Sequence, residues 1–140
     1  MRYNAVNSEG KTMLDHTGIA VSNWDKSKRF YEAALKPLAI VVVLEVTPEQ
    51  SGGGAHAGFG KSDKPVFWIG MGQHVSGPTH FAFTAESRAA VDEFYHAALA
   101  AGGRDNGAPG IREYYHPNYY GAFVLDPDGN NVEAVFHGGA

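Results

Sequence analysis

The hydrophobic and polar positions of the chain follow one order of patterns twice. Residues 14–21 and 79–85 alternate between apolar side chains and polar or small ones, which predicts a short strand in each half. Each strand is followed by apolar residues at helical spacing, in residues 27–35 and 87–101, which predicts an amphipathic helix. Further extended segments are predicted at residues 38–46, 57–59 and 66–71 in the first half and at residues 119–125 and 131–137 in the second.

Cap and turn residues separate these segments. Ser22 or Asn23 can cap the first helix, and Pro37 ends it because proline cannot continue the helical hydrogen bonding. A loop is predicted at residues 107–110, which contain two glycines and a proline. Residues 126–129, Asp-Pro-Asp-Gly, form a strong hairpin-turn sequence before the last strand.

An internal repeat relates the two halves. A shift of 64 residues places His16 on His80, Phe30-Tyr31 on Phe94-Tyr95, Ala34-Leu35 on Ala98-Leu99 and Phe59 on Phe123. The repeat predicts an α+β protein of two βαβββ modules that form one cupped mixed sheet with the helices on the outside. We expect a loosely ordered polar leader at residues 1–13 and a single domain at 14–138, with modules at 14–72 and 78–138.

Two histidines and one carboxylate are the strongest candidates for chemistry. His16 and His80 each share a strand face with small residues, whereas the bulky apolar residues of both strands point the other way. Glu133 likewise points away from its apolar neighbours in the last strand. A single strand histidine is more often structural, so the repeat equivalence of two histidines is what favours a metal site. Such a His-His-Glu set suits a divalent ion with open coordination positions.

Three segments carry a family resemblance, namely residues 14–21 (LDHTGIAV), 27–31 (SKRFY) and 126–133 (DPDGNNVE). With them the chain, over residues 13–138, resembles the vicinal-oxygen-chelate superfamily, the glyoxalase, bleomycin-resistance and extradiol-dioxygenase group. The resemblance implies metal ligands at His16, His80 and Glu133. The superfamily's fourth ligand position falls here on Trp68 or Ile69, neither of which can ligate.

The resemblance implies a metal-dependent enzyme that chelates a small oxygen-rich substrate to a divalent ion such as Zn, Ni, Mn or Fe, with lyase, isomerase, transferase or oxygenase chemistry. His116 or Tyr120 is the candidate for proton transfer, and Trp68, Tyr119 and Phe123 are candidates for contact with the ligand. The alternative is a metal-free protein of the bleomycin-resistance type that binds or sequesters a small molecule, which the tryptophan at a ligand position favours. A third alternative is a scaffold whose site has decayed. Members with one pair of modules are commonly dimers, so we expect a homodimer.

One reaction of the group is not expected. The extradiol ring-cleavage signature has a tyrosine at the position of Phe123 and an aliphatic residue at that of Ala122. Phenylalanine keeps the shape of tyrosine but cannot transfer a proton, and acid–base assistance of this kind is worth about 10²–10⁴ in rate. Negligible catechol cleavage is therefore expected.

Composition excludes several other classes of function. The net charge of −4 and the absence of a long basic run argue against nucleic acid or anionic membranes as partners. The chain has no cysteine, so thiolate metal sites and cysteine nucleophiles are excluded. Residues 55–62 fit a relaxed phosphate-loop pattern, but a proline and a strand follow where a helix N-terminus is needed. Without a visible secretion signal or apolar span, a cytoplasmic protein is the default expectation.

Overall fold

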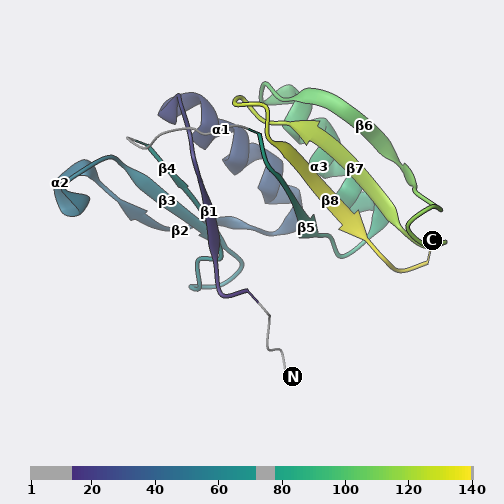
Figure 1. Ribbon diagram of the computed structural model, residues 1–140. Coiled ribbons are helices and arrows are strands. Elements are labelled where there is room, and N and C mark those ends of the chain that lie inside the picture. Colours follow the sequence, from purple (N-terminus) through teal and green to yellow (C-terminus); the bar gives the residue numbers. More distant parts are fainter. Residues whose placement is uncertain (1–13, 72–77, 140) are drawn as a thin grey trace.

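The computed structural model describes residues 14–71 and 78–139 (Figure 1). The predicted leader, residues 1–13, lies outside the described residues, as does residue 72, at the end of the first predicted module. The first module contains β1 (Thr17–Ala20), α1 (Trp24–Leu35), the 3₁₀ turn η1 (Lys36–Leu38), β2 (Val41–Val46), α2 (Pro48–Ser51), β3 (His56–Gly60) and β4 (Phe67–Gly70). The second module contains β5 (His80–Thr84), α3 (Arg88–Ala100), β6 (Arg104–Ile111), β7 (Tyr120–Leu125) and β8 (Asn131–Phe136).

The strands form two four-stranded mixed sheets with equivalent topology. The order is β1-β4-β3-β2 in the first sheet and β5-β8-β7-β6 in the second. In each sheet the first strand pairs in parallel with the last strand of its module, and the other pairs are antiparallel. The α+β class and the two modules are therefore confirmed. Among the described residues no strand pairing joins the two sheets, so they do not close into one continuous sheet.

A capping side chain precedes each of the two long helices, and Asn23 is one of the two caps predicted for the first. The Asn23 side chain accepts a hydrogen bond from the Lys26 backbone N–H, and the Ser87 side chain accepts one from that of Ala90. Each helix buries one apolar face, which includes Phe30 and Tyr31 in α1 and Val91 and Phe94 in α3. The two helices also pack against each other, and residues of both helices and both sheets form one continuous core.

One predicted loop is a strand. The loop expected at residues 107–110 belongs to β6, which pairs with β7 through a ladder interrupted by register shifts on both sides of Gly107. Gly107 has a φ of 151°, which glycine adopts without steric cost, so the ladder continues past it. The prediction was wrong because a tertiary partner strand outweighed the turn propensity of Gly and Pro. Strand β6 is the fourth strand of the predicted second βαβββ module, for which the sequence patterns had assigned no segment.

One predicted repeat equivalence also shifts by a residue. Gly58 pairs with Trp68 in the first sheet, and Phe123 pairs with Glu133 at the corresponding place in the second. Phe123 is therefore equivalent to Gly58, and not to Phe59. A shift of one residue moves a side chain to the other face of a strand. Phe59 accordingly lies fully buried in the core, against Tyr31 and Phe67.

A buried polar contact ties the two modules together. The Tyr31 hydroxyl of α1 donates to Asp126 Oδ2 at 2.5 Å, and Asp126 is 1% exposed. Burial, followed by the Asp126 carboxylate, raises the pKa of Tyr31 well above its usual value. Asp126 also accepts hydrogen bonds from the turn that it begins, at Asp128 N, Asn130 N and Asn130 Nδ2. Helix α1 of the first module is thus anchored to the β7–β8 turn of the second.

No helix within residues 14–71 and 78–139 has both the length and the apolar character required to cross a bilayer.

Candidate functional site

Each sheet has an open face on the side away from the helices. The open face of the second sheet carries His80 and Glu133, as strand alternation predicts. His80 Nε2 lies 3.0 Å from Glu133 Oε1, and the exposed fractions of the two side chains are 48% and 3%. Phe123, the cross-strand partner of Glu133, lies with its ring centroid 6.2 Å from that of His80. The carboxylate is therefore buried at the floor of this face, and the imidazole stands at its surface.

Tyr119 contacts the second carboxylate oxygen of Glu133. Its hydroxyl donates a hydrogen bond to Glu133 Oε2. Burial, followed by the hydrogen bond to Glu133, raises the pKa of Tyr119 far above its usual value. Tyr119 therefore remains a neutral donor at physiological pH and holds the carboxylate in one orientation.

His80 is also contacted on its other ring nitrogen. Asn131 Nδ2 lies 2.8 Å from His80 Nδ1, and Asn131 Oδ1 accepts a hydrogen bond from Asn106 Nδ2 at 3.1 Å. Asn131 is two residues before Glu133 in β8 and so points to the same face. That alternation is a sequence signal that could have identified Asn131, and the sequence analysis missed it.

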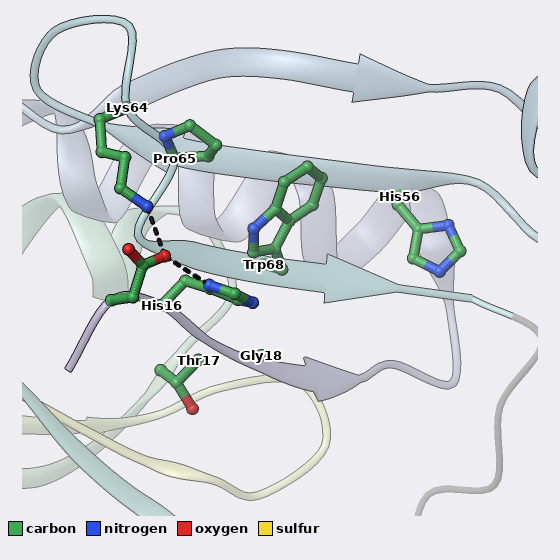
Figure 2. A pocket seen from close by; sticks show the side chains of 8 residues that line it. His16, Thr17, Gly18, His56, Lys64, Pro65 and Trp68 are labelled. Carbon is green, nitrogen blue, oxygen red and sulfur yellow. Dashed lines mark hydrogen bonds and ion pairs between the residues drawn. The ribbon is translucent and has the colours of Figure 1, made fainter.

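His16 belongs to a different set of contacts, on the first sheet. Its Nδ1 lies 2.8 Å from Asp15 Oδ1, and the same oxygen accepts a hydrogen bond from Lys64 Nζ at 2.5 Å (Figure 2). The hydrogen bond from Lys64, then that from His16, lowers the pKa of the Asp15 carboxyl. Asp15 and Lys64 were not predicted. The position of Asp15 directly before His16 was the available signal for one of them, whereas Lys64 reaches it from the β3–β4 loop.

The open face of the first sheet has an aromatic floor. Figure 2 shows Trp68 between Pro65 and His56. A Cβ added at Gly58 would lie 2.9 Å from the Trp68 ring, and one added at Gly70 would lie 2.6 Å from the His56 ring. Both rings therefore rest on glycine backbone. Together with Asp15, His16, Thr17, Gly18, Lys64 and Pro65, they line an open cavity of about 500 Å³.

The strand registers identify the position of Trp68 in the repeat. Gly18 pairs with Trp68 in the first sheet, and Ala82, its repeat equivalent, pairs with Glu133 in the second. Trp68, and not Ile69, is therefore the counterpart of Glu133. Ile69 is fully buried in the core. The first sheet thus offers His16 beside an indole where the second offers His80 beside a carboxylate.

The structure brings together some of the predicted site residues and separates others. His80, Glu133, Tyr119 and Phe123 lie together, and the His116 ring packs against Tyr119 and the His137 ring, with His116 Nε2 2.6 Å from His137 Nδ1. Within one chain His16 does not join this group, because no three His, Asp or Glu side chains of the described residues are placed to hold a metal.

Tyr120 points away from the open face of the second sheet. Its hydroxyl donates to Asp92 Oδ1 of α3 at 2.6 Å, and the Arg88 guanidinium lies 5.0 Å from its ring centroid. It is one residue from Tyr119 and therefore on the opposite side of β7.

The donor set of the second sheet fits a divalent ion. Two ligands at right angles, as in octahedral coordination, with bonds of about 2.1 Å are about 3.0 Å apart. His80 Nε2 and Glu133 Oε1 are separated by 3.0 Å, which is also the length of a direct hydrogen bond between them. Imidazole and carboxylate are ligands common to Zn, Mn, Ni and Fe sites. Two protein ligands alone do not make a complete site, so a further donor is needed.

Comparison with models of protein families assigns the chain to a superfamily. Residues 13–134 match the model of the Glyoxalase/Bleomycin resistance protein/Dioxygenase superfamily. The chain belongs to this superfamily, which confirms the resemblance drawn from the three sequence segments. A comparison with curated protein sequences gave no significant match.

Solved structures show the same fold. A glyoxalase/bleomycin resistance protein from Albidiferax ferrireducens T118 has a TM-score of 0.74 and 28% identity, over 91% of this chain and 100% of that one. A glyoxalase/bleomycin resistance protein/dioxygenase family enzyme from Burkholderia phytofirmans PsJN has a TM-score of 0.63 and 19% identity, over 88% of this chain and 97% of that one. Glyoxalase I from Zea mays has a TM-score of 0.66 and 18% identity over 87% of this chain. This chain covers only 43% of that longer protein.

Proposed function

We propose that the protein binds a divalent metal ion through His80 and Glu133, with His16 of a second copy as the third ligand, and acts on a small oxygen-rich molecule. The observation that carries the proposal is the separation of 3.0 Å between His80 Nε2 and Glu133 Oε1, with the carboxylate buried. A buried carboxylate is costly unless hydrogen bonds or a cation compensate it. One histidine and one tyrosine compensate it only in part, and a metal ion completes the neutralisation.

The need for a second copy follows from the separation of the two open faces. His16 does not reach the His80–Glu133 pair in its own chain, and both faces are exposed. A homodimer in which the first sheet of one copy faces the second sheet of the other would bring the three ligands together. The exposed apolar residues Leu14 and Leu44 of the first module, and Ile111 and Tyr115 of the second, suit burial in such an interface.

The residues of the chain then have separate roles in the chemistry. When bound, the ion supplies Lewis-acid stabilisation for a developing enolate or alkoxide. Tyr119 holds Glu133, and Phe123 keeps the floor apolar beside His80. His116 is the proposed proton carrier, with its ring 5.6 Å from that of Tyr119, and the His137 ring, 5.1 Å from Tyr119, lies beside it.

A mixing experiment tests the shared site. Alone, His16→Ala and Glu133→Ala should each bind Zn²⁺ or Mn²⁺ weakly in calorimetric titration. Hybrid dimers refolded from an equal mixture contain one intact ligand set and one set lacking both residues. We expect tight binding to return at up to one site per hybrid dimer. A control mixture of His80→Ala with Glu133→Ala breaks both sites and should not recover. Equal failure of both mixtures, with wild type binding tightly, would contradict a site shared between copies.

The aromatic floor supports a second candidate function, the metal-free binding of a planar small molecule. The Trp68 and His56 rings contact glycine backbone and line a cavity of about 500 Å³, a size suited to a small organic ligand. Stacking on an indole is favourable and does not need a metal.

The second candidate predicts a metal-independent loss of affinity in Trp68→Ala. Wild-type protein treated with chelator should bind members of a panel of planar aromatic compounds, with quenching of indole fluorescence. Loss of one stacked ring should weaken binding roughly tenfold, since such contacts are worth about 0.5–1.5 kcal/mol. Trp24→Phe is the matched control because Trp24 packs against the core and does not line the cavity. Equal binding by wild type and Trp68→Ala would exclude this function.

A further inference from the structure

The Asp15 carboxylate connects two side chains that come from different parts of the first module. Its Oδ1 atom accepts from Lys64 Nζ at 2.5 Å and lies 2.8 Å from His16 Nδ1 (Figure 2). The Asp15 and His16 side chains are 70% and 58% exposed. An exposed ion pair of this kind contributes little to folding stability. Its main effect is therefore on the side chains that it joins and not on the stability of the fold.

A carboxylate constrains the tautomer of a neutral imidazole. An ionised carboxylate only accepts hydrogen bonds, so the ring nitrogen that faces it must carry the proton. His16 therefore has its proton on Nδ1, and the lone pair of Nε2 is free. Metal-binding histidines are commonly held in this way, with the nitrogen that does not ligate bonded to a carboxylate, a carbonyl or water.

His80 is held differently. Asn131 lies on its Nδ1, and an amide can present either its NH₂ or its oxygen by turning over. Glu133 Oε1 lies 3.0 Å from His80 Nε2, so the same rule places the proton of neutral His80 on Nε2, with the Asn131 amide group facing Nδ1. Of the two repeat-equivalent histidines, His16 is the one preset to ligate through Nε2.

Lys64 is placed by the backbone of the neighbouring strand. It lies in the tight connection between β3 and β4, where a Cβ added at Gly60 would be only 2.0 Å from the Lys64 carbonyl oxygen. The Thr17 N–H bonds to the Val66 carbonyl at 2.9 Å, which aligns the start of β1 with the same connection. The ammonium group therefore reaches Asp15 from a defined position, although Asp15 itself precedes the regular strand.

We propose that Asp15, held by Lys64, is a positioning residue that keeps His16 in the Nδ1–H tautomer with Nε2 open for a ligand. The expected effect on metal affinity rests on the proposed function, whereas the expected tautomer of His16 is independent of it. Asp15 acts on the ion through His16 and is not itself a ligand.

Imidazole ¹⁵N chemical shifts of the full-length, metal-free protein at about pH 8.5, where histidine is neutral, test the inference directly. In wild type we expect the Nδ1–H tautomer for His16. In Asp15→Ala the population should move towards Nε2–H, and Lys64→Met should produce a smaller change. Asp63→Ala removes an exposed carboxylate next to Lys64 and is the matched control. Its His16 signals should be those of wild type, and the midpoints of thermal unfolding of all three variants should stay unchanged.

Zn²⁺ titration is the second measurement. Loss of an outer partner of this kind typically costs 10–100-fold in metal affinity, so we expect a loss in that range for Asp15→Ala and none for Asp63→Ala. A wild-type His16 with its proton on Nε2, or an Asp15→Ala variant with unchanged tautomer, would overturn the inference. If the wild type bound no Zn²⁺ but the tautomer changed in Asp15→Ala, the proposed metal function would fail and the role of Asp15 in orienting His16 would stand.

Discussion

Replacing Glu133 with glutamine should lower the affinity for Zn²⁺ or Mn²⁺ by more than about 100-fold, beyond the 10–100-fold typical of an outer partner. The substitution keeps the size of the side chain and an oxygen that can accept from Tyr119. It removes the negative charge and a carboxylate oxygen 3.0 Å from His80 Nε2. Calorimetric titration of the chelator-treated protein is the measurement.

The stability of the metal-free variant separates loss of a ligand from misfolding. Glu133 is 2% exposed, burial of a charge is costly, and the uncharged glutamine side chain keeps an oxygen that can accept from Tyr119. We therefore expect the unfolding midpoint without metal to be equal to or above that of wild type, while the upward shift that metal produces disappears. Glu113→Gln changes an exposed glutamate and should retain that shift. Unchanged metal affinity in Glu133→Gln would exclude Glu133 as a ligand.

Replacing Asp126 with alanine should lower the free energy of unfolding by about 3–5 kcal/mol. The carboxylate is 1% exposed and accepts four hydrogen bonds, from Tyr31, from Asp128 N, and from Asn130 N and Nδ2. Hydrogen bonds to a charged group contribute about 1.5–3 kcal/mol each, but contacts in one network are not additive, and single substitutions rarely cost more than about 5 kcal/mol. Thermal or urea-induced unfolding measures the loss, which corresponds to a midpoint lower by about 10 °C.

Two variants show whether the loss comes from this network. Tyr31→Phe removes one donor to Asp126 and should cost about 1–3 kcal/mol. In a double-mutant cycle the two substitutions should be strongly non-additive, because they remove the same contact. Asp63→Ala, at an exposed position, should leave the stability unchanged. Additive effects of Tyr31→Phe and Asp126→Ala would contradict the proposed link between α1 and the β7–β8 turn.

The periodicity of the sequence alone determined the α+β class, the two modules and the core faces of both helices, since helix and strand spacing reflect which side is buried. Alternation along the last strand also placed Glu133 on the opposite face from its apolar neighbours. The approach of His80 to Glu133 depends on the parallel pairing of β5 with β8, which joins residues 51 positions apart, as between His80 and Asn131. Alternation places each side chain on the open face of its own strand, and the pairing of the two strands brings the side chains together.

The tertiary structure alone decided three other features. Strand β6 forms because β7 offers it a hydrogen-bonding edge, despite the glycines and the proline that predict a loop. The assignment of Trp68 as counterpart of Glu133, and of Phe123 as counterpart of Gly58, depends on the strand registers, where one residue reverses the face. The separation of His16 from His80 depends on how the two modules pack through α1 and α3. Side-chain periodicity describes one element at a time and contains no information about that packing.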